Sequence, residues 1–282
     1  MTRLWQVRDR MLGGGTLPIL VGIVNVTPDS FFDGGAHPDA ASAIAHGLRL
    51  RDKGADQLDV GGESTRPGAA IVPVDEELRR VVPVIEALSA QGCAVAVDTR
   101  HPEVAAAALK AGAGAINDIE GLRDPCMIEL CRQYGAGACA MHMRGTPKDM
   151  QSAPAYHDVV EEVEQFLSEA LLRWRAAGLP EAAFAPDPGI GFGKTAVHNH
   201  ALVAATRRLR GAFPDSPWYL GMSRKSFIAG TPGVPAGSDR LAGSLGAAVT
   251  AFLSGADILR VHDVAATREA LLVAAACRGD VA

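Results

Sequence analysis

The chain has 282 residues, of which 48% are hydrophobic and 21% charged, enough for one large core or two small ones. Its net charge of −5 and the lack of a basic block argue against general nucleic-acid binding. No apolar run approaches the roughly 18 residues of a membrane span, and the N-terminal region lacks the cleavage site of a signal peptide. Five cysteines without CxxC spacing indicate reduced thiols in a cytoplasmic protein, with a zinc site as a weak second choice.

Apolar runs typical of strands alternate with alanine- and leucine-rich stretches of helical periodicity. The residues before Thr16 fit neither pattern. The predicted strands are 19–26, 57–60, 94–97, 115–117, 137–141, 184–185, 218–221 and 258–261. The predicted helices are 39–53, 74–90, 102–112, 125–134, 156–177, 198–209, 238–254 and 264–277. Proline at Pro102 and Pro125 suits a first helical turn, and glycines follow several helix ends.

Eight strand–helix units over about 250 residues predict a (β/α)8 TIM barrel. A doubly wound sheet would need a glycine fingerprint in its first turn and fewer repeats. No linker-like or low-complexity segment divides the chain. We therefore expect a single domain spanning 1–282, in which residues 1–16 form an N-terminal extension that covers the barrel bottom. The active site of such a barrel is expected at the C-terminal ends of the strands.

Polar residues follow every predicted strand. In chain order they are Asn25; Glu63, Thr65 and Arg66; Asp98; Asn117 and Asp118; His142; Asp187; Ser223, Arg224, Lys225 and Ser226; and Arg260 and His262. Any one of them could simply cap the next helix, but eight coincident cases favour a shared site. The stretch 221–226 is the strongest indication of a binding site, because it places Arg224 and Lys225 at a strand end. Burying such charges is costly unless an anion or a polar ligand binds them.

These side chains divide into two groups by chemistry. A flat heterocycle rich in N–H and C=O groups would suit Asp98, Asn117, Asp187 and Lys225. An anion or a phosphate would suit Asn25, Thr65, Arg66, Ser226, Arg260 and His262. Asn25 also supplies an oxygen for a hard cation such as Mg2+. Phe192 is expected to stack on the ring, whereas Gly193-Lys194-Thr195 lacks the spacing of a P-loop.

Two glycine-rich loops, residues 25–37 and 61–70, are long for ordinary connections. Glycines that flank polar and aromatic residues, among them Phe31 and Phe32, favour lids that close over a substrate and exclude water. A plain solvent loop is the alternative, but two adjacent exposed phenylalanines argue against it.

Eight motifs between residues 22 and 264 together resemble one family. They are GIVNVTPDSFFDGG, DVGGESTRPGA, VDTR, INDI, MHMRGTP, DPGIGFGKT, GMSRKSFI and RVHDV. In this order and spacing they resemble the dihydropteroate synthase family. The resemblance implies a TIM barrel, usually a homodimer, of the bacterial folate pathway. The family joins 6-hydroxymethyl-7,8-dihydropterin diphosphate to 4-aminobenzoate and releases diphosphate with Mg2+ assistance, and sulfonamides compete for the aminobenzoate position.

The resemblance also implies a role for each matched residue. The pterin pocket would comprise Asp98, Asn117, Ile119, Met141, Asp187, Phe192, Gly221 and Lys225, of which Asp98, Asp187 and Lys225 would be catalytic. The diphosphate would bind Asn25, Thr65, Arg66, Arg260 and His262, with Asn25 as the Mg2+ ligand. The 4-aminobenzoate would lie against Phe31, Pro67, Lys225 and Ser226. Phe32 departs from the small polar residue more common in the family, which leaves loop packing and the sulfonamide response open.

Three other functions fit part of the pattern. A pterin-binding methyltransferase would share the barrel but would not need the TPDSF and SRKSF segments. A non-catalytic paralogue that binds a pterin or a partner protein is disfavoured because the matched residues are intact. A Schiff-base aldolase could use Lys225, with Arg224 lowering its pKa, and inactivation by borohydride in the presence of substrate would reveal it.

Overall fold

The computed structural model describes residues 1–27, 40–65 and 68–280, and eight parallel strands form the centre of this part of the chain. Their order in the sheet is β8-β7-β6-β5-β4-β3-β10-β9, and the end strands β8 and β9 lie beside each other, so that the barrel is nearly closed. The strands are β3 (Ile19–Asn25), β4 (Gln57–Gly61), β5 (Val95–Asp98), β6 (Ala115–Asp118), β7 (Gly137–Met141), β8 (Phe184–Asp187), β9 (Tyr219–Gly221) and β10 (Ile258–Val261).

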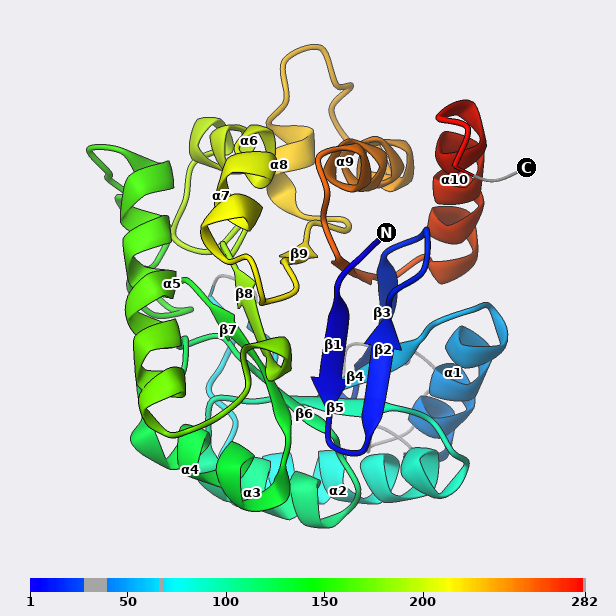
Figure 1. Cartoon of the computed structure of the whole chain (residues 1–282), viewed down its shortest axis with the longest axis vertical. Coiled ribbons are helices and arrows are strands. Elements are labelled where there is room, and N and C mark those ends of the chain that lie inside the picture. Colours follow the sequence, from blue (N-terminus) through cyan, green and yellow to red (C-terminus); the bar gives the residue numbers. More distant parts are fainter. Residues whose placement is uncertain (28–39, 66–67, 281–282) are drawn as a thin grey trace.

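Helices surround the sheet and complete the predicted (β/α)8 barrel (Figure 1). They are α1 (Ala40–Asp52), α2 (Val74–Ala90), α3 (Pro102–Lys110), α4 (Pro125–Tyr134), α5 (Val159–Ala176), α6 (Ala196–Ala204), α7 (Thr206–Ala212), α8 (Ser226–Ala229), α9 (Leu241–Leu253) and α10 (Val264–Cys277), with a 3-10 turn η2 (Glu181–Ala183). Pro102 and Pro125 occupy first turns, as predicted. Within the described residues, every helix is too short or too polar to cross a membrane.

Two predictions of local structure were wrong. The helix predicted over 198–209 is two helices, because Ala205, with ψ of 1°, ends α6 and begins α7. The residues before Thr16 form an antiparallel hairpin of β1 (Leu4–Val7) and β2 (Arg10–Gly13). Each of these strands is four residues long, which is too short for a clear alternating pattern. The turn between them needs a positive φ, 57° at Arg8, which the residue types there do not predict.

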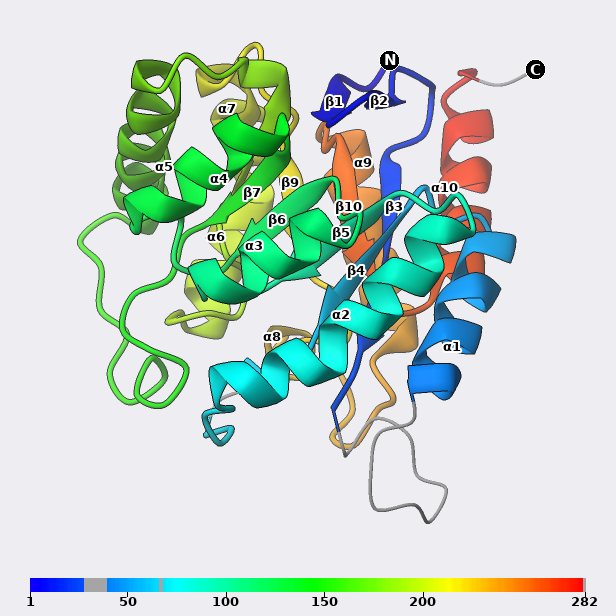
Figure 2. The same cartoon turned by 90° about the horizontal axis from the view of Figure 1, so that it is seen from below.

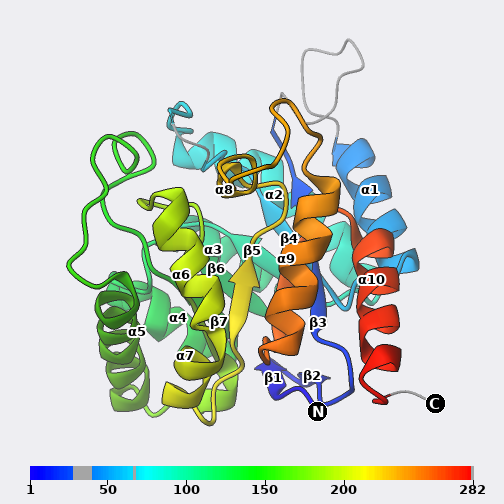
Figure 3. The same cartoon turned by 90° about the horizontal axis from the view of Figure 1, so that it is seen from above.

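The hairpin packs on the N-terminal ends of the barrel strands, opposite the loops that follow the strands (Figures 2 and 3). Trp5 and Val7 are buried in an apolar cluster there, and the Trp5 ring meets Tyr219 edge-on with centroids 6.1 Å apart. Arg3 fastens the hairpin by donating to the carbonyl oxygen of Phe213 at 2.7 Å. The N-terminal end of the barrel is therefore filled with apolar side chains.

Alternation along the strands sorts the barrel interior into layers. At the N-terminal end the inward-facing residues are apolar or small: Ile19, Val21, Ala96, Ala115, Cys139, Ala185, Tyr219 and Ile258. Side chains alternate between the two faces of a strand, so the residue two positions further on also faces inward. These next residues are Ile23, Asp98, Asn117, Met141, Asp187, Gly221 and Arg260. The interior therefore turns from apolar to polar toward the C-terminal ends of the strands.

Candidate active site

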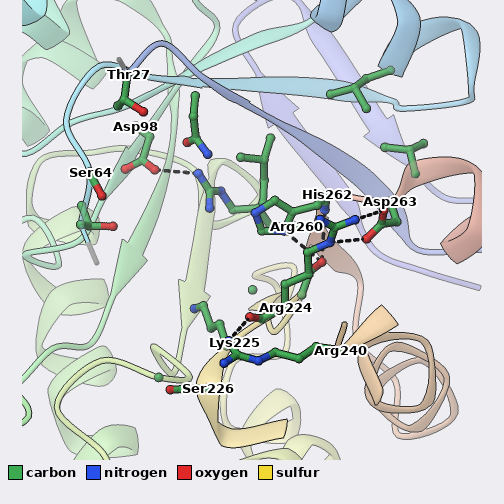
Figure 4. A pocket seen from close by; sticks show the side chains of 18 of the residues that line it. Thr27, Ser64, Asp98, Arg224, Lys225, Ser226, Arg240, Arg260, His262 and Asp263 are labelled. Atoms are coloured by element: carbon green, nitrogen blue, oxygen red, sulfur yellow. Dashed lines mark hydrogen bonds and ion pairs between the residues drawn. The ribbon is translucent and has the colours of Figure 1, made fainter. Parts of the chain in front are cut away.

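A cavity of about 1100 Å³ opens at the C-terminal ends of the strands (Figure 4). Nine predicted site residues line it: Asn25, Thr65, Asp98, Phe192, Gly221, Lys225, Ser226, Arg260 and His262. Four more are buried side chains of the barrel: Asn117, Ile119, Met141 and Asp187. Phe31, Arg66 and Pro67 lie outside the described residues. The nine cavity-lining residues come from six strands or the loops after them and meet at one mouth, as the barrel requires.

Arg260 lies at the centre of the charged groups and pairs with two carboxylates. Its Nε donates to Oδ2 of Asp59 at 2.6 Å, and its Nη2 donates to Oδ2 of Asp98 at 2.7 Å. Asn117 Nδ2 donates to the same oxygen of Asp59 at 2.9 Å. Burial disfavours the charged form of Arg260, but attraction by Asp59 and Asp98 outweighs this and raises its pKa. The guanidinium therefore stays charged and links β10 to β4 and β5.

Asp59 is a site residue that the sequence analysis missed. Its side chain is fully buried in β4. The available signal was a carboxylate within the apolar run 57–60, because a buried charge needs a partner. That partner, Arg260, is 201 positions away in the sequence, so only the folded chain identifies the pair.

Burial shifts the acid–base groups of the site. It raises the pKa of Asp98 to about 7, helped by Asp59 and opposed by Arg260. Burial also raises the pKa of Asp187, opposed by Lys225 and by the N–H of Gly189, which donates to Oδ1 at 2.7 Å. The pKa of Lys225 is lowered to about 8 by burial, against the attraction of Asp187. Asp98 and Lys225 thus titrate near neutral pH, which is typical of functional sites.

Gly221 leaves room between two cationic side chains. A Cβ there would lie 3.7 Å from Nζ of Lys225 and 3.8 Å from Cβ of Arg260. Lys225 Nζ also lies 4.5 Å from the ring centroid of Phe192 and donates to the carbonyl oxygen of Ile190 at 2.5 Å. The space beside Gly221 therefore suits a flat ring with polar edges.

An apolar wall borders this space. Phe192 packs against a buried cluster of Ile119, Met141, Met143 and Met150. Flexible thioether side chains fill irregular gaps and make favourable contacts with aromatic rings. Met141 is the register partner of Asp187 on the neighbouring strand, so this apolar wall lies next to that carboxylate.

The rim beside Arg260 carries hydroxyl and imidazole groups. Nδ1 of His262 lies 3.1 Å from Oγ of Ser223, and this oxygen also accepts the main-chain N–H of His262 at 3.2 Å. Arg224 donates to both carboxylate oxygens of Asp263, at 2.8 and 2.6 Å (Figure 4). These bonds join the loop after β9 to the loop after β10. Ser226 and His262 are thereby held on one rim.

Three polar residues expected at the mouth have structural partners. Glu63 lines the cavity but is paired with Arg100, with Nε 3.1 Å from Oε2. Asp118 is buried and accepts the main-chain N–H groups of Glu120 and Leu122 in the loop after β6, at 2.8 Å each. His142 is buried against Lys194, with Nδ1 and Nζ 2.9 Å apart. Asp118 and His142 are thus held at the ends of their strands by bonds within the chain.

Two places in the described residues could be considered for a metal ion. Ligand atoms of Glu63, Glu77 and His101 lie within 4.8 Å of one another. However, His101 Nδ1 is 2.7 Å from Oε2 of Glu77, and Glu63 is paired with Arg100, so these groups already have partners within the chain. Asn25 offers an amide oxygen at the end of β3 on the cavity wall. This fits Mg2+, which keeps several waters and takes further oxygens from a substrate's phosphates.

The chain is similar to proteins of one family over nearly its whole length. The family model described as pterin binding enzyme matches residues 21–262. The dihydropteroate synthase of Escherichia coli (strain K12) is 46% identical over 257 residues, covering 91% of this chain and 90% of that protein. The solved structure of Xanthomonas albilineans dihydropteroate synthase with 4-aminobenzoic acid matches with a TM-score of 0.90 at 46% identity, covering 99% of both chains.

A second solved structure agrees with the first. Burkholderia cenocepacia dihydropteroate synthase complexed with 7,8-dihydropteroate matches with a TM-score of 0.87 at 42% identity, covering 99% of this chain and 98% of that chain. Both the sequence identity and the coverage are far above what a shared barrel alone would give. The chain therefore belongs to the pterin-binding enzymes and, among them, to the dihydropteroate synthases.

Proposed function

We propose that the chain joins 6-hydroxymethyl-7,8-dihydropterin diphosphate to 4-aminobenzoate at this cavity and releases diphosphate. The observation that carries the proposal is the cavity that Asp98, Gly221 and Lys225 line, with the buried carboxylate of Asp187 near enough to attract Lys225. Two similar structures contain 4-aminobenzoic acid and 7,8-dihydropteroate, a substrate and the product of this reaction. The predicted roles of the individual residues are part of the proposal.

The dihydropterin ring would lie in the space beside Gly221. Oδ1 of Asp187 accepts the N–H of Gly189, and the carboxylate has further acceptor positions for an amino group and a ring N–H. Lys225 would donate to a ring carbonyl or nitrogen, while Phe192 and Met141 would cover the ring face. Asn117 contributes indirectly, since its amide donates to Asp59.

The transfer step needs charge stabilisation more than proton transfer. The aniline nitrogen of 4-aminobenzoate would form a bond to the pterin methylene carbon as the bond from that carbon to the diphosphate oxygen breaks. Positive charge would then develop on the ring, where the carboxylates of Asp98 and Asp187 stabilise it. The aniline is weakly basic and loses its proton to water after attack, so we assign no general base.

The leaving diphosphate would meet the opposite side of the site. Asn25, Thr65, Arg260 and His262 line the cavity there, and Arg66 is proposed from the family motif alone. A bound Mg2+, held by Asn25, would neutralise charge on the diphosphate oxygens. Arg260 already bonds two carboxylates, so its contribution would come from the Nη1 edge of its guanidinium and from its charge.

The 4-aminobenzoate would lie at the outer end of the cavity. Lys225 and Ser226, which line the cavity, would border this substrate, while Phe31 and Pro67 are proposed from the motifs alone. Closure of the loops 25–37 and 61–70 over this substrate stays a prediction, because residues 28–39 and 66–67 lie outside the described part. One link is present: the N–H of Gly68 donates to the carbonyl oxygen of Pro147 at 3.3 Å, joining the second loop to the chain after β7.

A homodimer in the cytoplasm is also proposed from the family. Leu253 on α9 and Leu272 and Val273 on α10 are large apolar residues with exposed side chains. Helices α9 and α10 pack side by side, and exposed apolar surface of this kind suits a protein interface. Light scattering of the purified chain would distinguish a dimer from a monomer.

Product identification tests the proposed function. The purified chain is incubated with the pterin diphosphate, 4-aminobenzoate and Mg2+, and the mixture is analysed by mass spectrometry. We expect 7,8-dihydropteroate, with far less from Asp187→Asn and a wild-type amount from Asp124→Asn. Asp124 caps α4 through the N–H of Cys126, and asparagine can keep that cap. Absence of the product with wild-type protein would overturn the proposal.

A further inference from the structure

The sequence Gly193-Lys194-Thr195 contains a buried amino group that the reaction above does not use. Thr195 is explained by the helix that follows, because its side chain accepts the N–H of His198 and caps α6. Lys194 is only 3% exposed. Burial lowers the pKa of Lys194 well below its usual value, and a buried amino group is costly unless it is hydrogen-bonded, so its surroundings should show what it holds.

Lys194 bonds two segments of the mouth to each other. Its Nζ lies 3.0 Å from the carbonyl oxygen of Gly189 and 2.9 Å from that of Phe192, both in the loop after β8. The same Nζ lies 2.9 Å from Nδ1 and 3.2 Å from the carbonyl oxygen of His142, in the loop after β7. Burial and Lys194 lower the pKa of His142 to about 2, so the imidazole is neutral and Nδ1 accepts.

Side-chain donors hold every carbonyl of the loop 189–193. Five consecutive carbonyl oxygens accept them: Gly189 and Phe192 from Lys194, Ile190 from Lys225, Gly191 from Gln151, and Gly193 from Tyr156. Lys194 therefore supplies two of the five bonds. A main chain bonded in this way has little freedom to open locally.

The loop also lies directly against the chain after β7. Gly189 has φ of 68°, and a Cβ there would overlap the carbonyl oxygen of His142. Gly193 has φ of 60°, and a Cβ there would come within 2.5 Å of the carbonyl oxygen of Arg144. Lys194 thus crosslinks two segments that already touch, at the base of the loop that carries Phe192.

We propose that Lys194 is a positioning residue for pterin recognition. By fixing the carbonyls of Gly189 and Phe192, it holds the Phe192 ring over Lys225 and keeps the N–H of Gly189 on the carboxylate of Asp187. Lys194 itself does not line the cavity among the described residues. The inference rests on the proposed function, because the ring that this wall would hold is the dihydropterin.

Lys194→Met tests the inference, because methionine fills similar space without donating. We expect the dissociation constant for 6-hydroxymethylpterin, measured by calorimetry, to rise at least tenfold. The KM for 4-aminobenzoate at saturating pterin diphosphate should change less than about threefold, since its side of the cavity keeps its contacts. Amide hydrogen exchange of residues 189–193 should become faster. Lys110→Met, at an exposed lysine in the last turn of α3, is the matched control and should change none of these values.

Binding of the bare pterin separates positioning from general stability. A purely structural lysine would lower the melting temperature but leave the pterin affinity of the folded protein unchanged, and that result would overturn the inference. If Lys194→Met does not fold, Lys194→Gln takes its place, because glutamine keeps two N–H donors. Its folded form should bind pterin at least threefold more weakly with faster exchange in 189–193, and unchanged affinity would again overturn the inference.

The experiment also separates this inference from the proposed function. Pterin binding requires no turnover. Wild-type protein that binds pterin but makes no dihydropteroate would refute the proposed reaction and leave the comparison with Lys194→Met valid. Wild-type protein that makes dihydropteroate, together with a folded Lys194→Met of normal pterin affinity, would refute the inference on Lys194 alone.

Discussion

Arg260 donates to Asp98 through a 2.7 Å bond between Nη2 and Oδ2. The sequence predicts Asp98 among the groups that bind the ring and Arg260 among the groups that bind the diphosphate. Their direct contact means that the two halves of the site share one ion pair. A change of charge at the diphosphate side should therefore change the electrostatic environment of the Asp98 carboxylate, which faces the ring.

This contact changes what we expect from two substitutions on β10 and the loop after it. Arg260→Ala should weaken binding of both 6-hydroxymethylpterin and its diphosphate, because Asp98 loses the partner that orients it. His262→Ala should weaken only the diphosphate ligand, by about tenfold or more, because its bonds are to Ser223 on the rim. Calorimetry with the two ligands measures both effects. If Arg260→Ala, like His262→Ala, weakened only the diphosphate ligand and left 6-hydroxymethylpterin binding unchanged, Arg260 would have no role in binding the ring.

Asp187→Asn keeps the shape of the pocket but removes a charge. The expected loss of transition-state stabilisation is about 2–4 kcal/mol, because the charge would face a developing cation in a closed site. The ratio of kcat/KM between wild type and variant gives this number directly. A wild-type value would remove Asp187 from the mechanism, and with it the proposed orientation of the ring.

Asp59 should matter for stability as well as for the site. Asp59→Ala leaves the buried guanidinium of Arg260 with one fewer carboxylate, and breaking such a buried pair costs about 3–5 kcal/mol of unfolding free energy. Chemical denaturation measures the loss. The double variant Asp59→Asn with Arg260→Gln should cost less than the sum of the two single changes, because the two residues interact directly. Additive losses would mean that the pair is not coupled.

The two titrating groups predict the pH dependence. Asp98, with a pKa of about 7, carries the negative charge that stabilises the developing cation only when it is ionised, so kcat/KM should rise as the pH increases through about 7. Lys225, with a pKa of about 8, loses its charge at higher pH, so kcat/KM should fall above about 8. Asp98→Asn should remove the acidic limb of the profile and Lys225→Gln the alkaline limb. A flat profile between about pH 6 and 9 would contradict these assignments.

Much of the fold could be predicted because its signals are local. Apolar runs mark the eight strands, and a glycine such as Gly135, with φ of 63°, marks the end of a helix. Strand periodicity also explains the site: Asp98 and Asn117 each stand two positions after a buried alanine of the same strand. The activity was predicted from the resemblance of the motifs to the dihydropteroate synthase family. The comparisons confirm both the barrel and the family.

The parts that could not be predicted depend on contacts between distant residues. Nothing in the sequence near Asp59 or Lys194 indicates which side chain or carbonyl group each will meet. The pairing of Arg260 with Asp98 spans 162 positions, and it is set by barrel closure, which brings β10 beside β3. The hairpin of β1 and β2 was missed for a different reason, since its strands are too short to show a period.

Release of diphosphate tests the central claim most directly. The purified chain is mixed with 6-hydroxymethyl-7,8-dihydropterin diphosphate and Mg2+, and free diphosphate is followed with a coupled assay, first without and then with 4-aminobenzoate. We predict that release stays at the background rate until 4-aminobenzoate is added and then proceeds with one diphosphate for each dihydropteroate formed. Release at the same rate without 4-aminobenzoate, or no release in its presence, would contradict the account.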